Sequence, residues 1–208
     1  MSTLTDRLFD DADKAPIDPF ALFEEWFAVA EAGEPNDPNA MAIATVDAEG
    51  LPDVRMVLLN GRDQRGFVFF TNFGSAKGRQ LLAQPRAAMV MHWKSVRRQV
   101  RARGPVEVVS AAEADAYFGR RARLSQLASS ASEQSRPLAS RAAYVERVEK
   151  LAAELGDRPV PRPPHWSGFR LVPLRLEFWQ EGAHRMHDRV EFVRPAPGAP
   201  WTRQRLYP

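Results

Sequence analysis

Blocks of apolar residues alternate with short polar turns through the middle of this chain. The blocks have strand length, end in turns rich in Gly, Asn, Asp or Lys, and occupy residues 40–46, 56–59, 67–70 and 87–93. Short apolar runs bounded by such residues are typical of β-strands. We predict strands at all four positions, and a hairpin in which residues 56–59 and 67–70 pair around the loop 60–66.

A second group of strand-like segments occupies residues 96–104, 169–180, 184–193 and 201–206. Alternation with period two places Gln99 on a polar face of the first segment. It also places Arg185, His187 and Arg189 together on one face of the third. Many antiparallel strands with few helices indicate a fold that is mainly β with peripheral helices, such as a β-barrel or a sandwich.

Helix signals separate these strands. Asp18 is a cap followed by proline at the first helical position, Ser75 is a favourable N-cap, and Ser110 forms a capping box with Glu113. We therefore predict helices over residues 18–33, from Ser75 onward, from Ser110 to Phe118, and over 141–155.

Two stretches lack a periodic apolar pattern. Residues 119–140 are rich in Arg, Ser and Gln, which by itself predicts a solvated loop. Residues 1–17 predict a mobile N-terminal arm. The remaining 18–208 are expected to form a single domain, since 208 residues with 44% hydrophobic content can bury a proper core.

Composition excludes several classes of protein. No apolar run approaches the ~20 residues of a membrane span, and the acidic, polar N-terminus does not resemble a signal peptide, so we expect a cytoplasmic protein with no membrane partner. There is no cysteine, and the four histidines are dispersed, so we expect no metal.

The charge balance permits anionic ligands. A formal net charge of +3 permits nucleic acid or small anions, but the arginines form no dense basic run, so we expect no nucleic acid. No glycine-rich dinucleotide motif, Walker loop or G-x-S-x-G motif is present, which removes the usual support for nucleotide hydrolysis and serine esterase chemistry. Phosphorylated small molecules fit the distribution of charge at least as well.

The first hairpin carries the pattern of an anion site. In its predicted pairing Arg55 lies opposite Asn72, at the end where the second strand leads to the helix that begins at Ser75. The free N–H groups at the start of that helix favour a phosphate. The side chains expected to converge there are Arg55, Thr71, Ser75 and Lys77. The alternative is a solvent-facing hairpin followed by an ordinary capped helix.

The row of Arg185, His187 and Arg189 is a second candidate anion site. Its alternative is a solvated edge strand that charge protects against aggregation. The residues alone therefore predict two phosphate-binding sites on a β-barrel, and they do not identify the ligand.

Several ordered motifs resemble the pyridoxine (pyridoxamine) 5′-phosphate oxidase family, from about Asp18 to the C-terminus. They are Arg55-Met56-Val57-Leu58-Leu59, Phe70-Thr71-Asn72, Ser75 with Lys77-Gly78, Arg98-Gln99-Val100, and Glu177-Phe178-Trp179-Gln180 followed by His184-Arg185-Met186-His187-Asp188-Arg189. The resemblance implies an FMN-binding split β-barrel and a homodimer with FMN at the subunit interface.

The resemblance also implies a role for each matching residue. The FMN phosphate would be held by Arg55, Thr71, Ser75 and Lys77. The rest of the flavin site would be formed by Met56, Val57, Leu58, Phe70, Gln99, Gln134, Ser135, Trp179 and Arg189. The substrate phosphate would be held by Asn60, Tyr117, Arg121 and Ser125, which makes residues 119–140 a clamp. Arg185 and His187 would lie over the substrate ring as catalytic residues.

The implied reaction oxidises pyridoxamine or pyridoxine 5′-phosphate to pyridoxal 5′-phosphate. A hydride would move from C4′ of the substrate to N5 of FMN, and dioxygen would reoxidise the flavin and yield hydrogen peroxide. The protein's part is to position the two rings and to stabilise charge, so donors such as Arg185 matter more than a nucleophile.

Three positions depart from the family pattern and keep other functions open. Asn60 stands where a lysine is usual, Ala76 stands where many members have arginine, and residues 124–130 lack the usual glycine and tryptophan. The alternatives are a related flavin oxidase with a different substrate and a non-catalytic FMN- or pyridoxal-phosphate-binding protein. A basic nucleic-acid binder comes last, because no aromatic-basic RNA motif is visible.

Overall fold

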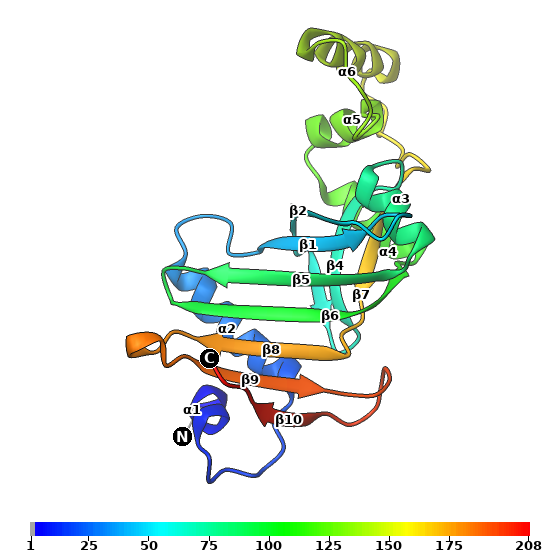
Figure 1. The fold of residues 1–208 in the computed structure, drawn as a ribbon. Coiled ribbons are helices and arrows are strands. Elements are labelled where there is room, and N and C mark those ends of the chain that lie inside the picture. Colours follow the sequence, from blue (N-terminus) through cyan, green and yellow to red (C-terminus); the bar gives the residue numbers. More distant parts are fainter. Residues whose placement is uncertain (1–2) are drawn as a thin grey trace.

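The structure is a computed structural model that describes residues 3–208 (Figure 1). Within those residues ten strands form one antiparallel sheet. The strands are β1 (Ala40–Val46), β2 (Pro52–Leu58), β3 (Gly61–Asp63), β4 (Gly66–Asn72), β5 (Arg86–Trp93), β6 (Arg98–Val108), β7 (Trp166–Leu171), β8 (Arg175–Gln180), β9 (Asp188–Val193) and β10 (Thr202–Arg205). The helices are α1 (Leu4–Phe9), α2 (Pro19–Gly33), α3 (Ala76–Ala83), α4 (Ala111–Arg120), α5 (Arg123–Ala131), α6 (Arg141–Leu155) and the 3-10 helix η1 (Ala183–Arg185).

The sheet divides at β6. Its main path runs in the order β10-β9-β8-β6-β5-β1-β2, and a branch runs from β6 through β7 and β4 to β3. Residues 98–103 of β6 pair with β8, whereas residues 106–108 pair with β7. Because one long strand belongs to both parts, the sheet curls into a half-barrel, with α3 and α4 beside the branch (Figure 1).

Helix α2 fills the inside of this curled sheet. Asp18 accepts a hydrogen bond from the Phe20 N–H at 3.0 Å and so caps the helix, as its sequence predicts. Phe23 and Trp26 are almost fully buried and meet the rings of Phe67 and Phe178 edge to face. Burying one such aromatic side chain contributes about 1.5–3 kcal/mol, so the aromatic face of α2 anchors both parts of the sheet.

The predicted hairpin between residues 56–59 and 67–70 is wrong. Strand β2 pairs with β1, so that Arg55 lies opposite Ile43 and not opposite Asn72. Only the short β3 pairs with β4, whose other edge is taken by β7 along residues 67–72. The apolar pattern predicted the approximate positions of β2 and β4. It did not predict that β4 pairs with β7, which lies far along the chain.

The predicted strand over residues 184–193 is also wrong in its first part. His184 and Arg185 have φ of 54° and 66°, in the left-handed region, which breaks the alternation of an extended strand. Gly182 is required at this turn because a Cβ there would lie 1.8 Å from the Met186 carbonyl oxygen. Arg185 and His187 therefore do not form one strand face with Arg189. The segment 169–180 likewise contains two strands, β7 and β8.

Two helices lie where the sequence pattern predicted none. Helix α5 occupies part of the predicted loop 119–140. Helix α1 lies in the predicted N-terminal arm, where Leu8 is buried and the Leu4 and Thr5 N–H groups donate to the Glu25 carboxylate at 2.9 and 3.0 Å. Residues 1 and 2 of that predicted arm lie outside the described residues. In residues 3–208 no helix combines the length and the apolar character needed to cross a bilayer.

Candidate functional site

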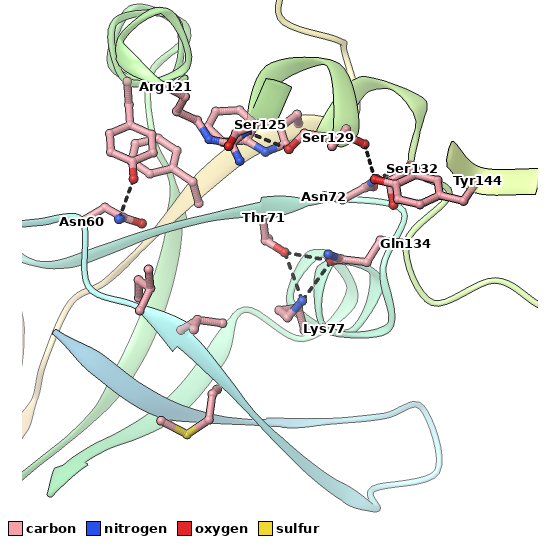
Figure 2. Close-up of a pocket in the computed structure, with 17 residues that line it drawn as sticks. Asn60, Thr71, Asn72, Lys77, Arg121, Ser125, Ser129, Ser132, Gln134 and Tyr144 are labelled. Carbon is pink, nitrogen blue, oxygen red and sulfur yellow. Dashed lines mark hydrogen bonds between the residues drawn. The ribbon is translucent and has the colours of Figure 1, made fainter. Parts of the chain in front are cut away.

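A cavity of about 450 Å³ lies between β2, β4, α3, α4 and α5 (Figure 2). This volume is in the range of small-molecule sites. The residues that line it are Met56, Val57, Leu58, Asn60, Phe70, Thr71, Asn72, Lys77, Tyr117, Arg121, Ser125, Ala128, Ser129, Ser132, Gln134, Tyr144 and Trp166. Many of the residues predicted for cofactor and substrate thus meet in one cavity.

Lys77 provides the positive charge at one part of the cavity. Its Nζ lies 3.2 Å from Thr71 Oγ1 and 3.0 Å from Gln134 Oε1 (Figure 2). No carboxylate of residues 3–208 lies within 4.0 Å of this ammonium. Burial, and secondly the nearby charge of Arg55, lower the pKa of Lys77, while the charge of Asp53 acts more weakly in the opposite direction. A half-buried cation without a carboxylate partner is a ready site for an anion.

The start of α3 holds Lys77 in place. Ser75 is buried, and its Oγ accepts a hydrogen bond from the Gly78 N–H at 3.1 Å as the predicted N-cap. Gly78 allows the helix to approach the end of β4, because a Cβ there would lie 2.5 Å from the Asn72 carbonyl oxygen. Ser75 therefore shapes the site through the helix start and does not line the cavity.

Arg55 lies near this place but does not line the cavity. Its guanidinium donates to Thr45 Oγ1 at 2.5 Å, to Gln80 Oε1 at 3.2 Å and to the Asp53 carboxylate. Its charge is the second cause, after burial, that lowers the pKa of Lys77. The expected convergence of four side chains on one anion is met here by Thr71 and Lys77, while Arg55 has other partners.

A second group of polar side chains lies where α4 and α5 meet the cavity. Asn60 Nδ2 donates to the Tyr117 hydroxyl at 2.7 Å, and Arg121 Nη1 donates to Ser129 Oγ at 2.7 Å (Figure 2). Arg121 also lies over the Trp166 ring at 5.1 Å, and burial lowers its pKa. Like Lys77, it has no carboxylate within 4.0 Å among residues 3–208.

Flat rings form a wall beside this group. Phe70 stacks on Tyr117 with 4.2 Å between ring centroids and on Trp166 with 5.3 Å, and the planes differ by only a few degrees. Met56 of β2 also lines the cavity and is 63% exposed. The cavity therefore combines two separate cations with apolar and aromatic surface, as a ligand with both rings and anionic groups requires.

The other predicted site residues form a separate cluster near η1. Gln99 pairs with Trp179, and Trp179 pairs with Arg189 on the next strand. The His187 ring lies 4.8 Å from the Trp179 ring, and Arg189 donates to Glu177 at 2.8 Å. In Figure 1, η1 lies at the end of the sheet away from α3 and α4. One chain therefore does not bring Arg185, His187 and this cluster to the cavity.

Several cavity residues were not predicted from the sequence. They are Asn72, Ala128, Ser129, Ser132, Tyr144 and Trp166. Ser129 is one helical turn after Ser125 on α5, so the two would have been placed on one face if residues 119–140 had been recognised as helical. Tyr144 of α6 donates to the Ala128 carbonyl at 2.8 Å and ties α6 to α5. Ser135, with φ of 69°, follows Gln134 but does not line the cavity.

Comparison with known proteins gives matches over nearly the whole chain. Residues 29–153 match the family model described as pyridoxamine 5′-phosphate oxidase. Residues 166–208 match the model described as pyridoxine 5′-phosphate oxidase C-terminal dimerisation region, which contains Trp179, Arg185, His187 and Arg189. The chain is 59% identical to the pyridoxine/pyridoxamine 5′-phosphate oxidase of Nitrobacter winogradskyi, over 100% of this chain and 95% of that protein.

Two solved structures have a similar fold. PhzG from Burkholderia lata, in complex with tetrahydrophenazine-1-carboxylic acid, has a TM-score of 0.87 and 31% identity, and the match covers 96% of this chain and 97% of that one. A pyridoxamine 5′-phosphate oxidase-related, FMN-binding protein from Nostoc punctiforme has a TM-score of 0.75 and 16% identity, with 93% and 100% covered. These likenesses confirm the predicted fold class, a split β-barrel with peripheral helices.

Proposed function

Since this chain belongs to the pyridoxamine 5′-phosphate oxidase family, we propose that it is an FMN-dependent oxidase that converts pyridoxamine or pyridoxine 5′-phosphate to pyridoxal 5′-phosphate. One observation carries the proposal: Lys77 and Arg121 are half-buried cations without carboxylate partners in a single cavity. Keeping an unpaired charge out of water is costly unless a ligand supplies the opposite charge. Two phosphorylated molecules, cofactor and substrate, would supply it.

The residues in the part of the cavity around Lys77 fit the phosphate of FMN. Lys77, Thr71 and the N-terminal turn of α3 would hold the FMN phosphate, since charge-assisted hydrogen bonds and a helix start both favour phosphate. Arg55 would add positive charge from beside the cavity. Gln134 and the β2 residues Met56, Val57 and Leu58 would contact the remainder of the cofactor.

The residues around Arg121 fit the substrate phosphate. One cationic and three neutral hydrogen-bonding side chains line the same part of the cavity, namely Arg121, Tyr117, Ser125 and Asn60. The Arg121 guanidinium is fixed by Ser129 and by the Trp166 ring, so little side-chain freedom is lost when an anion binds. This geometry supports a phosphorylated substrate.

A homodimer would complete each site. The matched dimerisation region contains the cluster with Trp179, Arg185, His187 and Arg189, which lies apart from the cavity of its own chain. Two-fold symmetry would bring the cluster of one subunit to the cavity of the other, and the same contact would be made twice. Arg185 and His187 would then face the substrate ring, and Gln99, Trp179 and Arg189 the flavin.

The chain's own residues would bind and orient the reactants. Bound FMN would supply the oxidation of the substrate and the transfer of its electrons to dioxygen, with hydrogen peroxide as the by-product. Arg121 and its neighbours would fix the substrate phosphate and thereby the position of the ring, while Arg185 would stabilise negative charge near the reacting carbon. The aromatic wall of Phe70, Tyr117 and Trp166 would exclude water from one side.

The likeness to PhzG supports a second candidate, a flavin oxidase with another substrate. That protein binds a carboxylic acid, and a single carboxylate could also pair with Arg121. The higher identity to pyridoxine/pyridoxamine 5′-phosphate oxidases favours the phosphorylated substrate.

The test is a reaction of purified protein with pyridoxamine 5′-phosphate. We expect a yellow protein that contains FMN, loses the colour of oxidised flavin when substrate is added without oxygen, and forms pyridoxal 5′-phosphate and peroxide in air. Arg185→Ala should lower turnover much more than it lowers FMN affinity. A flavin that stays oxidised with substrate would favour a non-catalytic binding protein, and reduction only by other substrates would favour the second candidate.

A further inference from the structure

Arg170 joins two separate segments of the chain from inside the protein. It lies on β7 between β4 and β6 and is only 4% exposed. Its Nη1 lies 2.8 Å from Asp63 Oδ1, and its Nη2 lies 2.8 Å from Glu113 Oε1. One planar guanidinium thus binds two carboxylates, one with each terminal nitrogen, which a lysine cannot reproduce because its ammonium is a single point of charge.

Both carboxylates stay ionised at neutral pH. Burial alone would raise the pKa of Asp63, but hydrogen bonds from Arg65 and the charge of Arg170 outweigh it, and the pKa is lowered. The pKa of Glu113 is lowered first by the Ser110 N–H, and further by Arg170. The contacts of Arg170 are therefore ionic, and their loss would leave a buried cation unpaired.

The two segments that Arg170 joins are the ones that carry the proposed phosphate-binding groups. Asp63 ends β3, three residues after Asn60. Glu113 is in the first turn of α4, one turn before Tyr117. The hydrogen bond from Asn60 to Tyr117 closes the loop of contacts on the cavity side. Arg170 therefore helps to fix the distance between Asn60 and Tyr117 from the side of these segments that faces away from the cavity.

We propose that Arg170 is a positioning residue, which fixes β3 against α4 so that Asn60 and Tyr117 meet the substrate phosphate together. The inference rests on the proposed function, because that function assigns the phosphate to these groups. Arg170 itself does not line the cavity. It acts through Asp63 and Glu113, and its effect belongs to substrate binding and not to the flavin end at Lys77.

Three variants test the proposal in the FMN-loaded protein. Arg170→Met removes both ionic contacts and can fail to fold, so Glu113→Gln and Asp63→Asn each remove one charge from a partly exposed position. Glu113→Gln keeps a side-chain oxygen for the capping box of α4, so the helix start is kept. We expect the KM for pyridoxamine 5′-phosphate to rise by about tenfold, with kcat within about twofold and FMN affinity unchanged. A fourth variant, Arg170→Lys, keeps the positive charge but not both contacts, so its KM should lie between those of the wild type and Arg170→Met.

Arg65→Ala is the matched control. Arg65 touches the same two carboxylates at 2.8 and 3.4 Å, but its side chain is 65% exposed, where water weakens an ion pair. We expect this variant to keep the wild-type KM. If Glu113→Gln and Asp63→Asn also keep it, the proposal is overturned. It is also overturned if the rise in KM is accompanied by an equal loss of kcat and of FMN affinity, as in a general loss of structure.

Equilibrium binding of pyridoxal 5′-phosphate separates this inference from the proposed function. A wild-type protein that binds this compound without oxidising pyridoxamine 5′-phosphate would refute the oxidase. The positioning role would then still be tested by the dissociation constants of the variants, which should rise about tenfold for Glu113→Gln and not for Arg65→Ala. A wild-type protein that neither binds nor reacts would overturn both.

Discussion

Two single residues in the cavity, Lys77 and Arg121, are cations without the ion pairs that would offset their burial. Lys77 is half-buried, and its neighbours Thr71 and Gln134 offer neutral oxygens and no negative charge. Arg121 has the hydroxyl of Ser129 and the Trp166 ring as partners. An isolated protein gains little from such cations, because each loses hydration without an ion pair in return. We expect removal of the charge to stabilise the free protein and to weaken ligand binding.

Lys77→Met tests whether loss of the charge stabilises the free protein and weakens ligand binding, since Met keeps an unbranched side chain of similar length. We expect the Tm of the FMN-free protein to rise by about 2–4 °C, equivalent to about 1 kcal/mol, while FMN affinity falls by at least about tenfold. Because the folded-state pKa of Lys77 is lowered from 10.5, the cost of its charge is present below the folded pKa and disappears as pH rises towards 10.5. The difference in Tm should therefore shrink at high pH. Thermal unfolding and flavin fluorescence measure both effects, and unchanged FMN affinity would contradict the placement of the phosphate.

Asn60→Lys tests the departure from the family pattern. Asn60 Nδ2 donates a neutral hydrogen bond to the Tyr117 hydroxyl at 2.7 Å, in the part of the cavity proposed to bind the substrate. A lysine would add a charge-assisted contact to a phosphate there. We expect binding of pyridoxamine 5′-phosphate or of product to tighten by about tenfold, or ~1.4 kcal/mol, with FMN affinity unchanged. Steady-state kcat/KM and the product Kd measure it. An unchanged or weaker interaction would mean that Asn60 does not face the substrate phosphate.

At the level of elements, α5 is the part of the site that local sequence signals concealed. Its N-cap residue, Ala122, makes no side-chain capping bond, although α2, α3, α4 and α6 all have a capping Asp or Ser. The uncapped start of α5 lies between Arg121 and Ser125, which both line the cavity. The unsatisfied N–H groups and the positive end of the helix dipole are thus available to an anion.

A pair of substitutions at position 122 separates capping from charge. Ala122→Ser should cap α5 and raise the free energy of unfolding by about 1 kcal/mol. Ala122→Asp should stabilise the helix similarly, but its carboxylate would compete with the substrate phosphate for Arg121, so we expect a KM about tenfold above that of the serine variant. Urea unfolding and steady-state kinetics provide the two measurements. Equal KM values in the two variants would show that the start of α5 does not face the substrate anion.

At the scale of the whole molecule, the proposed site needs two chains. The cavity with Arg121 and the cluster with Arg185 are held by different parts of one sheet, and a strand-based scaffold is too stiff to fold one onto the other. The match of residues 166–208 to a dimerisation region supports an arrangement in which two chains share each site. Each chain would provide half of two identical sites.

Mixed dimers test this division. Arg121→Ala and Arg185→Ala should each be nearly inactive alone. Random reassociation of the two should restore about a quarter of wild-type activity, because half of the dimers contain both chains and each of these has one intact site. The control pairs Arg121→Ala with Lys77→Ala, two changes in the same half, which should restore nothing. Absence of activity in the first mixture would mean that both halves of a site come from one chain.

The sequence by itself determined the elements whose signals are local. Strand β1 and helix α6 have the predicted bounds, and the predicted caps at Asp18, Ser75 and Ser110 are present. Caps and short apolar runs act within a few residues, so a linear pattern contains them. The ordered motifs likewise indicated the family, which the comparisons confirm.

Only the tertiary structure decided which segments meet. In the structure β2 pairs with β1, and β4 pairs with β7. The expected strand is interrupted at His184 and Arg185, and residues 123–131 form a helix that borders the cavity. These outcomes depend on the choice of partner strand, such as β7 for β4, or on a turn with φ above zero, and neither leaves a periodic pattern. Of the two predicted phosphate-binding sites, the one expected from the hairpin and the helix start lies at one cavity, whereas the row expected from alternation lies in a distant cluster. Side chains meet through pairing across the sheet and not through spacing along a strand.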